Sequence, residues 1–131
     1  MAKFDTVTEP AIAVLVDRFY ESARRDDVIG PVFNEAVEDW DDHLERLRAF
    51  WSSVMLTTGR YKGNPMAAHL KHPIEPAFFE RWLGLWQRTA AAVFAEAEAA
   101  RFTEKAERIA ESLKLALYYR PGALGVARPG E

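Results

Sequence analysis

The sequence predicts a single all-α domain, and three observations lead to this prediction. The chain has 131 residues, a length that suits one domain with an ordinary hydrophobic core. Apolar residues recur at spacings of three and four along most of the chain, which is the period of an amphipathic helix. No stretch alternates between apolar and polar residues for long enough to indicate a strand. There is also no internal repeat that would divide the chain into smaller units.

A first amphipathic helix is expected to end near Arg25. Thr8 offers a hydroxyl that can cap it, and Pro10 suits the first turn because that turn needs no backbone N–H from it. The apolar face is formed by Ile12, Leu15, Val16, Phe19 and Tyr20. The charged residues 24–27 are expected to be a solvated helix end.

A Gly-Pro pair at 30–31 breaks the pattern. The short apolar stretch 32–34 is expected to continue as a turn, with Phe33 pointing inward. A second helix should then run over about 38–57. Its apolar stripe consists of Trp40, His43, Leu44, Leu47, Trp51, Val54 and Met55.

Residues 58–65 contain two glycines and a proline, so they are expected to form a loop. A helical fragment of 66–70 at most should follow, and it carries His69. Beyond Pro76 a third helix is expected to reach about Ala99.

The last helix is expected to be capped by Thr103. Its inward stripe consists of Ala106, Ile109, Ala110, Leu113, Ala116 and Leu117. Residues 121–131 hold two prolines and three glycines, so this tail is expected to be frayed.

Charge and composition exclude several classes of function. The chain has 20 acidic and 17 basic residues and a net charge of −3, so it lacks the positive field that nucleic-acid binding requires. No stretch stays uncharged for the roughly 18 residues of a membrane span, and the protein is expected to be cytoplasmic. Since there is no cysteine, any metal must be held by histidine, carboxylate or a cofactor.

Four polar residues on otherwise apolar segments indicate a pocket, and we expect it to hold a haem. They are Tyr20, His43, His69 and Trp82. A haem needs an axial nitrogen, a flat apolar slot and, for dioxygen, hydrogen-bond donors on the other face. His69 follows a loop that lets it approach the iron end-on, whereas His43 lies on the inward stripe of the preceding helix. Tyr20 and Trp82 carry the donors. His72 is a rival iron ligand that spacing alone leaves open.

Six motifs, in this order and spacing, resemble a truncated haemoglobin of the third group. The motifs are Phe19-Tyr20-Glu21, Gly30-Pro31-Val32-Phe33-Asn34, Trp40 with His43, Phe50-Trp51, Tyr61-Lys62-Gly63-Asn64-Pro65 with His69-Leu70, and Phe78-Phe79-Glu80-Arg81-Trp82-Leu83. The resemblance covers about 4–119 of a single 1–131 domain. It implies a shortened globin fold, in which a two-over-two helical sandwich encloses haem b.

The resemblance also implies a role for each site residue. His69 would be the proximal iron ligand, Tyr20 and Trp82 distal donors, and His43 the distal histidine that gates the ligand. The haem pocket would be lined by Phe33, Leu47, Trp51 and Trp82. Among the polar loop residues 60–62, which could reach the haem propionates, Tyr61 is assigned to the cofactor.

The function expected from this resemblance is reversible binding of dioxygen, nitric oxide or another small haem ligand by a monomer or weak dimer. Nitric oxide dioxygenase or peroxidase activity, with an unidentified reductase, is an open alternative. An alternative of a different class is a cofactor-free helical interaction module, in which the aromatic residues form a dry core.

Overall fold

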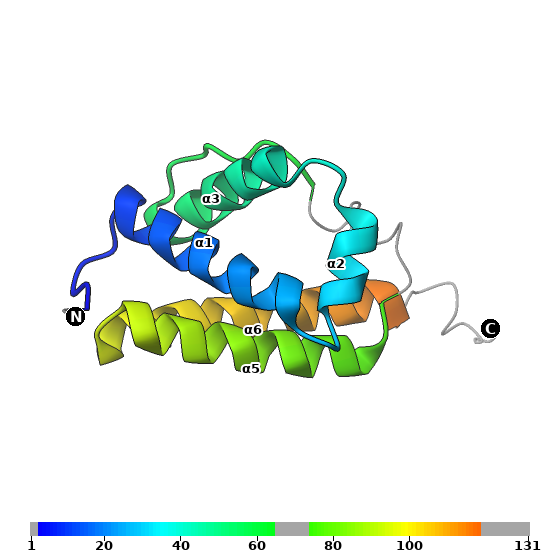
Figure 1. The fold of residues 1–131 in the computed structure, drawn as a ribbon. Coiled ribbons are helices and arrows are strands. Elements are labelled where there is room, and N and C mark those ends of the chain that lie inside the picture. Colours follow the sequence, from blue (N-terminus) through cyan, green and yellow to red (C-terminus); the bar gives the residue numbers. More distant parts are fainter. Residues whose placement is uncertain (1–2, 65–73, 119–131) are drawn as a thin grey trace.

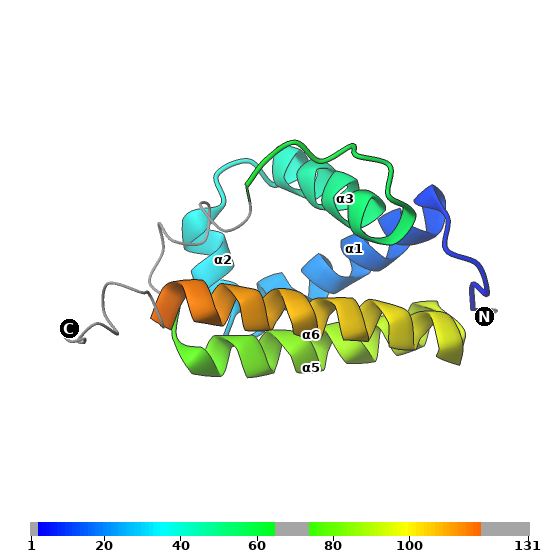
Figure 2. The same cartoon turned by 180° about the vertical axis from the view of Figure 1, so that it is seen from behind.

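The structure is a computed structural model that describes residues 3–64 and 74–118. In these residues it has five helices, namely α1 (Glu9–Arg25), α2 (Gly30–Ala36), α3 (Trp40–Leu56), α5 (Pro76–Val93) and α6 (Glu96–Tyr118). α1 and α3 lie over the antiparallel pair α5 and α6, while α2 stands at one end (Figures 1 and 2). The predicted all-α, two-over-two architecture is confirmed. The expected fragment 66–70 and tail 121–131 lie outside the described residues.

The core lies where α1 packs against α2, α3 and α5, and where α5 packs along α6. The predicted apolar face of α1 is buried along its whole length. Burying one large apolar side chain of this kind contributes about 1.5–3 kcal/mol, so this face holds the two layers together. None of the helices in the described ranges combines the length and hydropathy that a membrane crossing requires.

The ends of α1 and α3 are set by local side-chain and backbone interactions. The Thr8 hydroxyl accepts a hydrogen bond from the Ala11 amide at 3.3 Å. The Asp39 carboxylate does the same for the Asp42 amide at 3.1 Å. α3 ends where Thr57 adopts a left-handed conformation with φ of 54°. The predicted bounds of both helices are therefore right to within about two residues.

The expectation of a turn at 32–34 is wrong, because these residues belong to α2. Pro31 lies in the first turn, where its missing N–H is not needed. Gly30 is required by space, since a Cβ atom there would lie 2.8 Å from the Arg24 carbonyl oxygen. The Gly-Pro pair therefore begins a helix.

The predicted boundary between the last two helices is also wrong. The third helix was expected to reach Ala99, but α5 ends at Val93 and α6 begins at Glu96. Between them Phe94 is extended, and the N-terminal segment pairs with this break: the Phe4 amide bonds to the Val93 carbonyl at 3.0 Å, and the Ala95 amide bonds to the Phe4 carbonyl at 2.8 Å. Tertiary contact here overrides the high helix propensity of an alanine-rich run.

Asp26 corrects the expectation of a solvated end for α1. Its side chain is only 5% exposed, and it accepts a hydrogen bond from Arg81 Nε on α5 at 2.8 Å. Its other oxygen accepts from the Val28 and Ile29 amides. The bond from Arg81 is the main reason that the pKa of Asp26 lies below its usual value. Asp26 thus joins the corner before α2 to α5.

Replacing Asp26 with asparagine is expected to lower the free energy of unfolding at neutral pH. Asparagine can still accept from the backbone amides but loses the ion pair with Arg81. Because the folded-state pKa of Asp26 is depressed, its contribution is present above the unfolded value of about 3.9 and is lost as pH falls through the folded value. Urea unfolding at a series of pH values should therefore show the wild-type and variant curves converging in acid.

The matched control is Asp27→Asn, because Asp27 is 90% exposed and lies 3.6 Å from Arg81. This control should show little pH-dependent difference from the wild type. A difference for Asp26→Asn that stays constant down to strongly acid pH would mean that the ion pair contributes nothing.

Candidate functional site

A cavity lies between the two helical layers. Its volume is about 970 Å³ when the solvent-filled space at its open mouth is included. It brings together seven of the residues that the sequence assigned to a pocket, namely Tyr20, Phe33, His43, Leu47, Trp51, Tyr61 and Trp82. Seven further residues complete the lining, namely Arg46, Phe50, Phe78, Phe79, Ile109, Ala110 and Leu113. The two candidate iron ligands, His69 and His72, lie outside the described residues.

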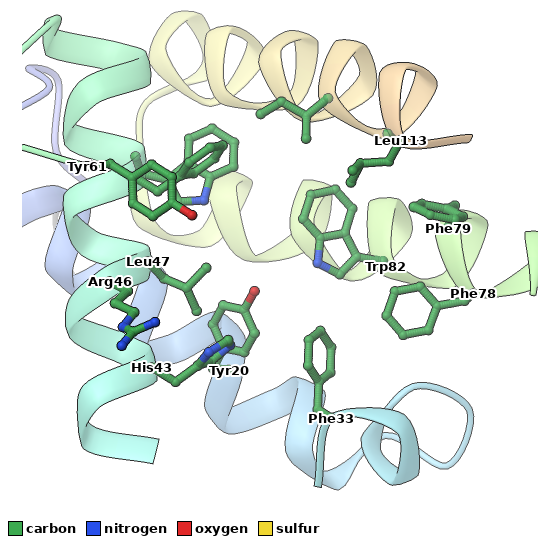
Figure 3. Close-up of a pocket in the computed structure, with 14 residues that line it drawn as sticks. Tyr20, Phe33, His43, Arg46, Leu47, Tyr61, Phe78, Phe79, Trp82 and Leu113 are labelled. Carbon is green, nitrogen blue, oxygen red and sulfur yellow. The ribbon is translucent and has the colours of Figure 1, made fainter. Parts of the chain in front are cut away.

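Tyr20 reaches the cavity from the buried face of α1 and is 5% exposed. Its ring stands edge-on to Phe33 at 5.3 Å and to His43 at 5.9 Å between centroids. Figure 3 shows the Tyr20 hydroxyl and the Trp82 indole nitrogen turned toward the same space. Burial raises the pKa of Tyr20 well above the usual tyrosine value, and a hydrogen bond from Trp82 only partly offsets this. The phenol therefore keeps its proton and can act as a donor.

His43 lies on α3 at the boundary between the cavity and a second hollow. Its ring is edge-on to that of Trp40 at 5.5 Å between centroids. His43 and Arg46 line both spaces, and the second hollow is formed by α2, the start of α3 and Ile74. A side chain in this position can control passage between the cavity and the outer hollow.

Two indoles of the cavity lining, Trp51 and Trp82, belong to a stack of three whose central ring is Trp86. Trp82 and Trp86 are nearly parallel, with centroids 5.8 Å apart and planes at 10°. Trp86 and Trp51 are closer, at 4.5 Å and 19°. Trp86 is fully buried, and its Nε1 donates to the Phe102 carbonyl at 3.3 Å. The two indoles at the cavity are therefore held in place by packing on a buried ring.

The loop after α3 divides its side chains between two directions. Arg60 pairs with Glu9 on α1 and with Glu45 on α3, so its guanidinium is engaged away from the cavity. Tyr61 instead packs its ring against Phe50 at 5.3 Å and lines the cavity. Of the polar loop residues considered in the sequence, Tyr61 is therefore the one placed at the site.

Arg46 is a cationic site residue that the sequence analysis missed. It lies one turn after His43, on the same face of α3, and its guanidinium pairs with Asp42 at 2.9 Å. The side chain is 72% exposed, so it can reach an anionic group at the mouth of the cavity. Its spacing of three residues from His43 is the sequence signal that could have identified it.

The residues present fit a haem. The aromatic side chains of the lining suit a planar apolar macrocycle. The Tyr20 and Trp82 donors are turned into the same space and could reach a ligand bound there. Arg46 supplies a positive charge where an acidic substituent would meet solvent. This combination of aromatic walls, two donors and a peripheral cation differs from a dry helical core.

Comparison with known proteins gives one consistent result. Residues 3–117 match the bacterial-like globin family. The chain is 36% identical over 121 residues to the group 3 truncated hemoglobin ctb of Campylobacter jejuni, an alignment that covers 88% of this chain and 95% of that protein. Its fold is similar to the crystal structure of group III truncated hemoglobin from Campylobacter jejuni, with a TM-score of 0.84 and 35% identity, covering 89% of this chain and 96% of that one.

Proposed function

The chain belongs to the bacterial-like globin family, and from this premise we propose that it binds haem b and reversibly binds dioxygen or another diatomic ligand at the ferrous iron. The observation that carries the proposal is the pair of donors, Tyr20 O–H and Trp82 N–H, in a cavity lined mainly by aromatic and aliphatic side chains. When bound, haem supplies the iron to which the diatomic ligand attaches. The cofactor-free interaction module is not favoured by this family membership.

We propose His69 as the axial ligand, with His72 as the rival. A neutral imidazole nitrogen is the usual proximal ligand of haem in globins. Both histidines lie outside the described residues, so the assignment rests on the motif resemblance. It is tested by the first experiment of the Discussion.

Tyr20 and Trp82 would act together on the bound ligand. Dioxygen on ferrous iron gains negative charge, and hydrogen bonds to a charged acceptor are stronger than neutral ones. We propose that the Tyr20 O–H and the Trp82 N–H both donate to this ligand, since both groups are turned toward the same space. We propose that His43 controls access from the outer hollow, as its position at the boundary suggests.

Nitric oxide dioxygenation and peroxide turnover would use this same cavity. Both reactions need electrons from outside the chain, so an unidentified reductase or small donor would be a partner. The distal donors would stabilise a bound ligand, and they are compatible with nitric oxide dioxygenation and with peroxide turnover alike. Reversible binding is therefore the proposal, and the two reactions remain its alternatives.

The test is the absorption spectrum of the haem-reconstituted chain in ferric, dithionite-reduced and oxygenated forms. We expect stoichiometric haem uptake, an intense Soret band and a reversible change with dioxygen. Haem binding should also stabilise the fold by mass action, by about 2.7 kcal/mol when free haem is at 100 times its Kd. A protein that stays colourless, and whose melting temperature does not change when haem is added, would contradict the proposal.

Replacing Arg46 with glutamine is expected to speed haem loss by a factor of about 1.4 to 5. This follows from the 0.2–1 kcal/mol typical of an exposed ion pair, here between the guanidinium and a haem propionate. Transfer of haem to an apoglobin acceptor measures the rate. The control is Arg108→Gln, because Arg108 forms a similar exposed pair with Glu104 on α6, outside the cavity lining. Equal rates for the two variants would remove Arg46 from the haem site.

A further inference from the structure

All four tryptophans of the chain belong to one connected set of rings. Trp82, Trp86 and Trp51 form what we call the indole stack, whose two ends line the cavity and whose centre is fully buried. Tyr20 is connected to the stack through Phe19, whose ring centroid lies 4.7 Å from that of Tyr20 and 5.0 Å from that of Trp86. On its other side Tyr20 approaches Trp40, with centroids 6.1 Å apart. A connected set of rings, most of them readily oxidised, therefore touches the cavity at several points.

The indole stack is suited to hold a positive charge. Indole loses one electron more readily than most side chains, and the faces of neighbouring aromatic rings attract a cation. Trp86 lies nearly parallel to two such rings, Trp51 at 4.5 Å and Trp82 at 5.8 Å between centroids. Its N–H donates to the Phe102 carbonyl, and this bond strengthens as the oxidised ring becomes more acidic. Charge on Trp86 is therefore stabilised by both neighbouring indoles and at the N–H edge of the ring.

The other two oxidisable rings of the set are poorer sites for that charge. The Arg24 guanidinium lies 4.3 Å from the centre of the Trp40 ring, so it repels a positive charge there. Oxidation of Tyr20 requires its phenolic proton to leave, whereas burial raises the pKa of that group and holds the proton in place. When a group in the cavity removes one electron from these rings, the positive charge should therefore be localised on the indole stack.

We propose that the indole stack is a one-electron oxidation site that donates to a hydroperoxide reduced in the cavity. This inference rests on the proposed haem function. Hydrogen peroxide takes up two electrons and two protons to give two waters. The indole stack would supply one of these electrons and a bound haem would supply the other, while both protons come from solvent. The stack is left with one positive charge and keeps the Trp86 N–H proton. Diffusible one-electron donors then return both electrons, one to the stack and one to the haem.

The first test is rapid-freeze electron paramagnetic resonance of the ferric haem-loaded chain after mixing with hydrogen peroxide. The expected radical changes its hyperfine pattern when tryptophan rings are deuterated, and does not change when tyrosine rings are deuterated. Trp86→Phe should lose this tryptophan signal, whereas Trp40→Phe should keep it. A signal that belongs to tyrosine, or that survives in Trp86→Phe, would overturn the proposal.

A second test does not depend on haem. Pulse radiolysis with azidyl radicals oxidises tryptophan in the haem-free full chain. Facing indoles that share one charge should then give a near-infrared charge-resonance band, which is lost in Trp86→Phe and retained in Trp40→Phe. Trp82→Phe provides a second variant that leaves the closer Trp51–Trp86 pair in place, and its band should shift. Absence of the band in the wild type would overturn the indole stack as the oxidation site, whereas failure to take up haem would overturn the proposed function.

Discussion

The His69→Ala chain is expected to lose its axial iron–nitrogen bond and most of its ability to retain haem. Loss of a group that merely hydrogen-bonds to a metal ligand lowers metal affinity roughly 10- to 100-fold. Loss of the ligand itself should therefore have a larger effect. The measurement is the Soret spectrum and the rate of haem transfer to an apoglobin acceptor. The matched control is His72→Ala, which removes a neighbouring histidine and should keep the wild-type spectrum.

Imidazole added to the His69→Ala chain provides a check on the interpretation. If the variant is folded and lacks only the ligand, free imidazole should occupy the vacant position and restore the spectrum. If instead His72→Ala loses haem and His69→Ala keeps it, the assignment of the two histidines is reversed.

Replacing Tyr20 with phenylalanine is expected to speed dioxygen dissociation by about 10- to 150-fold. The estimate follows from the 1.5–3 kcal/mol that a hydrogen bond to a charged group contributes. Phenylalanine keeps the ring contacts with Phe33 and His43 and removes only the hydroxyl. Stopped-flow displacement of dioxygen by carbon monoxide measures the rate. An unchanged rate would exclude Tyr20 as a donor to the ligand.

Two further variants distinguish effects on the rate of ligand dissociation from effects on the rate of ligand entry. His43→Ala should mainly speed association, because His43 lies where the cavity meets the outer hollow. Trp82→Phe should also speed dissociation. Its effect should not add to that of Tyr20→Phe, because the two donors are turned toward the same space and would act on one ligand. Strict additivity would mean that the two donors act independently.

Local patterns predicted the parts of this fold that depend on neighbouring residues in the sequence. The face of α1 and the cap at Thr8 follow from helical spacing and side-chain chemistry, so they could be predicted. The cap expected at Thr103 is wrong, because α6 already begins at Glu96. The break at Phe94 could not, because it depends on backbone bonds to Phe4, about ninety residues earlier in the chain. The ion pair of Asp26 was missed for the same reason, since Arg81 is 55 residues away.

In the cavity too, single residues could be predicted from local sequence, whereas contacts between helices could not. Tyr20 and Trp82 were singled out because a polar group on an apolar face is unusual wherever it occurs. The stacking of Trp51 on Trp86 joins α3 to α5, and no spacing within either helix reveals it. Arg46 could have been found by extending the face of His43 by one turn.

The backbone of Phe4 pairs with the break at Phe94, so the N-terminal segment helps to determine that α5 and α6 are two separate helices. These backbone bonds hold a sharp corner in an alanine-rich run whose intrinsic preference is to continue as helix. Without Phe4, α5 and α6 could fuse into one long rod, and a rod cannot fold back on itself. Each half would then find its partner in a second molecule, which is the geometry of a domain-swapped dimer. In this way a few residues at the start of the chain favour folding within a single molecule.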